Sequence, residues 1–233
     1  LFILIFFTVY AASCLVTCGK LFSTLFGLDY VPMMIVGAVF VLVYTIIGGF
    51  LAESASDFMQ AIVMIVALVV IVITGTVTAG GVSSVIENAE SIPGFLDFFG
   101  IASPVTVDGV QQSVNGVPQF GAAGSYGFVA IISTLAWGLG YFGMPQVLLR
   151  FMAIRSEHEL TRSRRIATVW VLISLFVAVF IGVVGRVLYP DALTTASASE
   201  NVFILLSTNL LPPLLAGLVM AGILAATISS SDS

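Results

Sequence analysis

Six long apolar segments constrain the fold of this chain more than any other feature. Each has close to the roughly 20 residues that a helix needs to cross the hydrocarbon core of a bilayer. They lie at about 1–19, 32–51, 58–80, 126–149, 166–189 and 211–231. Backbone N–H and C=O groups find no water in lipid, so each segment is expected to be helical. The sequence predicts an all-α polytopic membrane protein with about six transmembrane helices.

The composition agrees with this prediction. Charged residues make up 8% of the chain, hydrophobic residues 59%, and the mean hydropathy is +1.17. A soluble domain carries roughly 25% charged residues. We expect a single transmembrane bundle over residues 1–233. Because the chain opens inside one apolar run and closes at the end of another, we also expect it to be a fragment of a longer protein.

The basic residues cluster between the fourth and fifth apolar segments. Five of the seven lie there, namely Arg150, Arg155, Arg162, Arg164 and Arg165. The positive-inside rule places this connector in the cytoplasm, a role that we favour over binding of lipid phosphate or a nucleotide. By alternation, connectors 20–31, 81–125 and 190–210 are external, and the last of these is compatible with a short helix over the outer mouth. Connector 52–57 is cytoplasmic and short, which predicts a tight antiparallel hairpin.

The fourth apolar segment carries Trp137-Gly138-Leu139-Gly140-Tyr141-Phe142-Gly143, followed by Met144-Pro145. Three glycines and a proline predict two half-helices joined near residues 138–143. A broken spanning helix is typical of a transporter binding site. Trp137 and Tyr141, four residues apart, share a helix face and offer that site an aromatic wall. The alternative is a glycine-rich packing face with an interfacial aromatic pair.

Ionisable groups that a membrane-embedded enzyme needs are missing from the apolar segments. None carries an Asp or Glu at its centre, and the single histidine, His158, lies in the arginine-rich connector. Proton relays in pumps usually need such groups. The sequence therefore argues against an enzyme and against a proton-driven pump, and so apolar a chain has no nucleic-acid partner.

Hard oxygen donors are present instead in the sixth segment. Ala226, Ser229 and Ser230 are spaced at i, i+3 and i+4, which places two hydroxyls and a helix carbonyl on one face. A neutral oxygen site suits Na⁺, because a monovalent ion must bind and then leave. The alternative is that each hydroxyl bonds back to the preceding helical turn or packs against a small residue.

Asp57 stands just inside the start of the third segment, near the predicted cytoplasmic face. It has two compatible interpretations: a carboxylate on the intracellular route of a cation, or the N-cap or first-turn residue of the helix. Glu53, in the preceding connector, is interpreted as a solvated residue.

Four short sequences are informative when taken together. They are Phe6–Ser13, Gly48–Ala52 running on to Asp57, Trp137–Pro145 with its continuation Leu149–Ala153, and Ile223–Ala226 with Ser229. Together they resemble the sodium/solute symporter family, and its sodium/proline branch most closely. The likeness covers nearly the whole chain and is weakest in connector 81–125.

The resemblance implies a leucine-transporter-like core of ten helices in two inverted five-helix repeats, of which the six segments would be core helices three to eight. It implies substrate-pocket roles for Tyr10, Trp137, Tyr141 and Pro145. It further implies that Ala226, Ser229 and Ser230 contribute to a Na⁺ site, and that Asp57 serves the passage of the ion.

These observations favour a sodium-coupled importer of a small organic solute, L-proline above all, that works by alternating access. The alternatives are the same fold carrying another solute, such as pantothenate or a different organic anion, and more remotely a structural or channel bundle. Na⁺ is then the coupling ion, no other cofactor is expected, and the partners are the solute and the lipid bilayer. The expected location is the plasma membrane, as the inner membrane of a bacterium.

Overall fold

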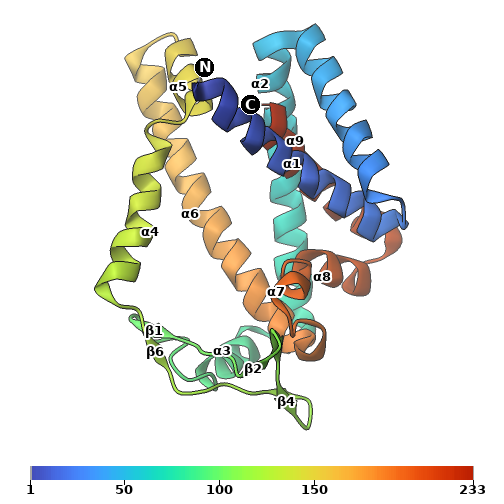
Figure 1. Ribbon diagram of the computed structural model, residues 1–233, viewed down its shortest axis with the longest axis vertical. Helices are drawn as coiled ribbons and strands as arrows, with labels where there is room; N and C mark the ends of the chain where they lie inside the picture. Colours follow the sequence, from blue (N-terminus) through green and yellow to red (C-terminus); the bar gives the residue numbers. More distant parts are fainter. Residues whose placement is uncertain (1, 233) are drawn as a thin grey trace. The chain divides into compact units, whose positions relative to one another are not determined.

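All six apolar segments are helical in the computed structural model, which describes residues 2–232 apart from the side chains of Cys18, Leu21, residues 24–26 and Asp232. The long helices are α1 (Phe2–Phe26), α2 (Tyr30–Thr78), α4 (Phe128–Tyr141), α5 (Pro145–Ala153), α6 (Glu157–Leu188) and α9 (Pro213–Asp232) (Figure 1). Within the described residues, α2, α6 and α9 are long and apolar enough to cross a membrane, and the bent pair α4–α5 passes the same test as a fourth candidate. The chain is a helical membrane protein.

The predicted hairpin between the second and third segments is present, but its position was wrong. Residues 52–57 are helical, and α2 is instead broken at Gly49, which has φ 57° and ψ −161°. Only glycine adopts this conformation without strain, so the pair Gly48-Gly49 makes the turn. In Figure 1 the two arms of α2 run in opposite directions on either side of this break. The polar residues that suggested a connector lie in the first two turns of the second arm.

The chain is divided into two compact units. The first comprises residues 1–70 and 213–233, and the second residues 71–212. In the first unit α1 packs against α9, and α9 approaches the second arm of α2 closely. A Cβ atom on Gly222 would lie 2.8 Å from the Cβ of Ala67, so these helices meet through small residues.

In the second unit α4 is followed by α5, and α6 then runs in the direction opposite to α4 (Figure 1). The core forms where α6 meets α3 (Val82–Glu90) and α8 (Val202–Leu210). Val85, Val184 and Leu206 are fully buried there. The predicted external connector 190–210 contains the short helices η1 (Pro190–Ala192) and α7 (Ala196–Ser199) besides α8, as the sequence suggested for this segment.

The long connector after α3 folds into three small antiparallel pairs of two-residue strands. The pairs are β1 (Gly100–Ile101) with β6 (Gly124–Ser125), β2 (Thr106–Val107) with β3 (Val110–Gln111), and β4 (Ser113–Val114) with β5 (Val117–Pro118). Two tight turns close the inner pairs, at Asp108-Gly109 and Asn115-Gly116, and all four of these turn residues have positive φ. Such dipeptides are strong hairpin signals, so this structure could have been read from the sequence.

Replacing Gly185 by alanine should destabilise the second unit. An added Cβ would collide with Cγ2 of Val202 where α6 meets α8. Val202 is β-branched and cannot rotate away cheaply, so we expect a loss of about 1–3 kcal/mol. The thermal unfolding midpoint of the purified protein measures this loss. Gly182→Ala, one turn earlier in α6, is the matched control, because its new methyl group meets no atom within 4 Å. Equal midpoints for the two variants would contradict the packing of α6 on α8.

Candidate functional site

The fourth apolar segment is two half-helices, as its glycines and proline predicted. α4 ends at Tyr141, α5 begins at Pro145, and their axes differ by 45°. Gly138 and Gly140 lie within α4, so the break falls at Phe142–Met144, at the end of the predicted region. Met144 has an extended backbone, which the following proline imposes on it.

The backbone at the break is only partly hydrogen-bonded. The N–H groups of Phe142, Gly143 and Met144 donate to carbonyls three residues earlier, at 3.3, 3.1 and 3.4 Å, instead of four residues earlier. Pro145 has no N–H. As a result, the carbonyls of Phe142 and Gly143 accept no backbone hydrogen bond within the described residues. A break in a spanning helix thus presents two carbonyl oxygens to whatever lies beside it.

Trp137 and Tyr141 share one face of α4, as their spacing predicts, and Pro145 starts α5 directly after the break. Both aromatic side chains are largely exposed, Trp137 at 74% and Tyr141 at 53%. They line neither of two pockets in the second unit, one beside Arg186 and the other between α3 and α6. Their exposure shows that packing within their own unit does not use these rings, so they are available to a ligand or to another helix.

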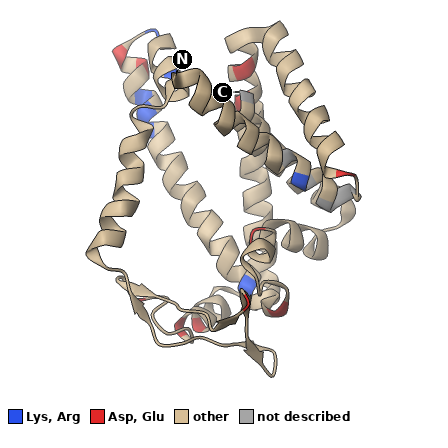
Figure 2. Cartoon of the chain, viewed as in Figure 1, with Lys and Arg blue, Asp and Glu red and all other residues tan. Residues whose placement is uncertain are grey.

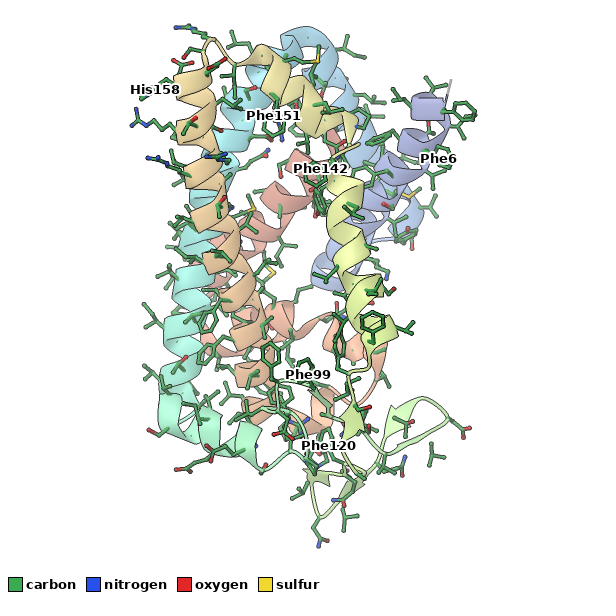
Figure 3. The ribbon with its side chains drawn as sticks, turned by 90° about the vertical axis from the view of Figure 1, so that its left-hand side faces the viewer. Phe6, Phe99, Phe120, Phe142, Phe151 and His158 are labelled. Carbon is green, nitrogen blue, oxygen red and sulfur yellow. The ribbon has the colours of Figure 1, made fainter. Side chains whose placement is uncertain are left out.

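Tyr10 belongs to the other unit, where it lies in α1 beside Phe7 with ring centroids 5.8 Å apart. Its substrate-pocket role and those of Trp137, Tyr141 and Pro145 remain predictions. In Figure 3, Phe142 marks the start of the break directly after α4, and Phe151 lies on α5.

The oxygen-bearing face of α9 forms as the spacing predicts. The hydroxyls of Ser229 and Ser230 both donate to the carbonyl of Ala226, at 3.1 and 3.0 Å, which gathers three oxygens on one half-buried face. This is also the geometry of the alternative, in which hydroxyls bond back to the helix. A hydroxyl group that donates a hydrogen bond also carries two acceptor lone pairs on its oxygen. The group is therefore chemically able to receive a monovalent cation.

Asp57 is half-buried within the second arm of α2. The interpretation of this residue as an N-cap or first-turn carboxylate was wrong, because the arm already begins after Gly49, about two turns earlier. The interpretation of Glu53 as a solvated residue was also wrong: it is 7% exposed. The helix that replaced the predicted connector accounts for both errors, since it carries the two carboxylates into the packed unit.

Most basic residues of the second unit lie at one end of α6, although Glu157 and Glu159 lie there too and Arg186 lies at the other end. Figure 2 shows basic residues at the junction of α5 and α6, and acidic residues around α3 and the strands at the other end of α6. His158 is exposed in the first turn of α6, as expected of a solvent-facing histidine (Figure 3). Among the described residues no group of three or more His, Cys, Asp or Glu side chains is placed to hold a metal.

Arg186, near the end of α6, is a functional candidate that sequence reasoning missed. Its guanidinium carbon lies 4.3 Å from the centroid of the Phe120 ring, and it lines a pocket. The signal available in the sequence was a lone arginine at the external end of a predicted span, far from the cytoplasmic cluster.

The sequence of the chain is similar to those of known transport proteins. The model of the sodium:solute symporter family matches residues 1–233. The chain is 37% identical to the osmoregulated proline transporter OpuE of Bacillus subtilis (strain 168), covering 100% of this chain and 43% of that protein. It is 38% identical to the sodium/proline symporter of Salmonella typhimurium and 37% identical to that of Escherichia coli (strain K12), covering 99% of this chain and 42% of each relative.

The chain therefore spans about two fifths of the length of these curated relatives. No solved structure matches it. The family model matches the whole chain, and several relatives are 35–38% identical to it. The chain belongs to the sodium:solute symporter family.

Proposed function

We propose that this chain is part of a sodium-coupled secondary transporter that imports a small organic solute, with L-proline as the substrate. The observation that carries the proposal is the match of the family model to every residue, together with relatives named as proline transporters. The protein is then a transporter and not an enzyme. It lies in the plasma membrane with the arginine-bearing junction of α5 and α6 in the cytoplasm.

The solute binds at the break between α4 and α5. Trp137 and Tyr141 form an aromatic wall on one face of α4, against which a compact pyrrolidine ring packs, and Pro145 fixes the start of α5. The substrate-pocket role of Tyr10, which lies in the other unit, is the one that the family resemblance implies. Support comes from the 45° bend, the two carbonyls without backbone partners and the exposed rings. Binding sites of secondary transporters are typically built from such discontinuous helices.

Na⁺ binds at the α9 face formed by Ala226, Ser229 and Ser230. The two hydroxyls supply lone pairs, and the Ala226 carbonyl becomes a ligand when one hydroxyl turns away from it. Asp57 lies on the ion's route to the cytoplasm as an acidic group in the same compact unit as α9. The Na⁺ gradient drives uptake, and alternating access moves one group of helices against the other.

The six apolar segments correspond in this proposal to core helices three to eight of a ten-helix inverted-repeat core, which form a single bundle within the complete transporter. The two arms of α2 are then core helices four and five, and the pair α4–α5 is core helix six. The break at Gly49 then connects these two transmembrane helices, core helices four and five.

Radiolabelled L-proline uptake tests the proposed function. Cells that lack their own proline transporters and express the complete protein should accumulate proline in the presence of an inward Na⁺ gradient. They should lose this uptake when choline replaces Na⁺ or when an ionophore collapses the gradient. Excess unlabelled pantothenate should not compete. Uptake that ignores the gradient would contradict sodium coupling, and competition by pantothenate in place of proline would reassign the solute.

A further inference from the structure

The second unit contains a pocket that none of the roles above uses. It has a volume of about 240 Å³. It lies where the last turn of α6 meets the short helices that follow α6 and the strand segment, the stretch 100–125 that carries β1 to β6. The strand segment is held there by backbone bonds, including one from the Gln111 N–H to the Thr194 carbonyl at 2.7 Å. Its lining includes Gln111, Phe120, Arg186, Pro190, Ser199 and Val202. Figure 3 shows Phe120 at this end of the molecule, among the strands.

Arg186 supplies the positive charge of the pocket. Its guanidinium lies over the Phe120 ring at 4.3 Å, and its Nε is buried without a hydrogen-bond partner. Arginine has five N–H donors in a planar fork that matches a carboxylate. A buried donor without a partner costs free energy, and a buried charge is normally paired. The ring face contacts the guanidinium of this half-buried residue but accepts no conventional hydrogen bond, so the buried Nε–H donor remains without a partner.

No carboxylate compensates this charge inside the pocket. Among the described residues that line it, the only polar side chains besides Arg186 are Gln111 and Ser199, and both are neutral. The Gln111 amide donates one of its two hydrogens to the Gln119 carbonyl at 3.2 Å, which leaves a second N–H donor. The pocket thus combines one cation and one further donor with a largely apolar wall.

Two simpler explanations account for the position of Arg186 but not for its surroundings. A cation in the last turn of a helix is favoured by the helix dipole, and an arginine at the end of a span reaches toward water. Either effect would be served by an exposed guanidinium. Here Phe120, from the strand segment, lies over the guanidinium, and Nε is buried away from water without a hydrogen-bond partner. An anionic ligand that accepts from Nε would explain this arrangement.

We propose that this pocket is an external subsite for the carboxylate of the solute, occupied before the solute reaches the break between α4 and α5. This rests on the proposed function, which supplies an amino acid as solute and places this end of α6 outside the cell. The carboxylate pairs with the Arg186 guanidinium, and the Gln111 amide donates to it. The apolar body of the solute contacts the three prolines of the lining, Pro104, Pro118 and Pro190.

Protection of an engineered thiol tests the subsite. Ser199 lines the pocket and is exposed, so Ser199→Cys in the complete protein should react with a membrane-impermeant maleimide added outside the cells. Labelling is measured in Na⁺-free medium, so that coupled closure at the central site does not contribute. We expect L-proline and acetate to slow the reaction, while L-prolinamide, which lacks the carboxylate, and chloride do not. Ser197→Cys, exposed in the same short helix but outside the pocket lining, should be unaffected.

The arginine is tested in the same assay. Arg186→Gln should raise the proline concentration for half-protection about tenfold or more, because a hydrogen bond to a charged group is lost. Arg162→Gln, at the other end of α6, should leave it unchanged.

Each alternative result has one meaning. Absence of protection in cells that take up proline would overturn the subsite and leave the proposed function standing. Equal protection by chloride or prolinamide would overturn the carboxylate assignment. Protection by proline in cells without Na⁺-driven uptake would retain the subsite as a carboxylate site and remove the proposed function.

Discussion

The double substitution Ser229→Ala, Ser230→Ala should raise the Na⁺ concentration that half-saturates proline uptake by about tenfold or more. Both hydroxyls converge on the Ala226 carbonyl, so the two changes remove two of the three oxygens on this face of α9. Losing polar contacts to a charged ligand typically costs about 1.5–3 kcal/mol each, and 1.4 kcal/mol is a factor of ten. Alanine adds no bulk and favours the helix, so the abundance of the protein should hold.

The Na⁺ activation curve of uptake in the complete protein measures this effect. At limiting Na⁺ the apparent affinity for proline should also fall, because coupling between two ligands is reciprocal. Ser231→Ala is the matched control. Its hydroxyl donates to the Thr227 carbonyl at 2.8 Å, away from the Ala226 group. If the double variant kept the wild-type activation curve, the hydroxyls would only bond back to the helix, and the ion-site assignment would be wrong.

The second large effect is expected at Tyr141. Tyr141→Ala should raise the half-saturating proline concentration about tenfold, because it removes an aromatic surface that stacks against the ring of the solute. The side chain is 53% exposed, and α4 has no buried residue among those described, so the folded unit should tolerate the loss. The KM of proline uptake and the amount of protein in the membrane are measured together.

Leu139→Ala serves as the control for this variant, since Leu139 is also exposed and lies on another face of the same half-helix. It should leave the KM unchanged. A fall in membrane abundance with an unchanged KM for Tyr141→Ala would support the alternative in which the aromatic pair only packs.

Local chemistry explains which parts of the fold could be predicted from the sequence. The apolar segments had to be helical because lipid offers their backbone no partner. The break after Tyr141 followed from Pro145, which removes one N–H and restricts the residue before it. The turn at Gly49 was misplaced because the polar stretch after it was given more weight than the glycine pair, although the conformation at Gly49 is one that other residues avoid. The hairpin turns at Asp108-Gly109 and Asn115-Gly116 were not predicted, although such dipeptides are strong turn signals.

Some of the candidate sites could likewise be predicted from the sequence, and others could not. Faces built within one helix, such as that of Ala226, Ser229 and Ser230, follow from spacing alone. The pocket around Arg186 could not be predicted, because Phe120 and Ser199 reach it from segments far apart in the sequence, and only tertiary structure brings them together.

The backbone at residues 142–144 has a mechanical consequence. Pro145 has already removed one hydrogen bond of the ladder, and the carbonyls of Phe142 and Gly143 accept none from the backbone, so the angle between α4 and α5 can change without breaking a regular helical bond. We therefore expect this point to act as a hinge between two stiff rods, the half-helices α4 and α5. The rod that begins at Pro145 ends at Ala153, just before the start of α6, and carries Arg150 in its last turn. A swing of this rod would reposition the inner end of the fourth span while the aromatic rings on α4 stay in place.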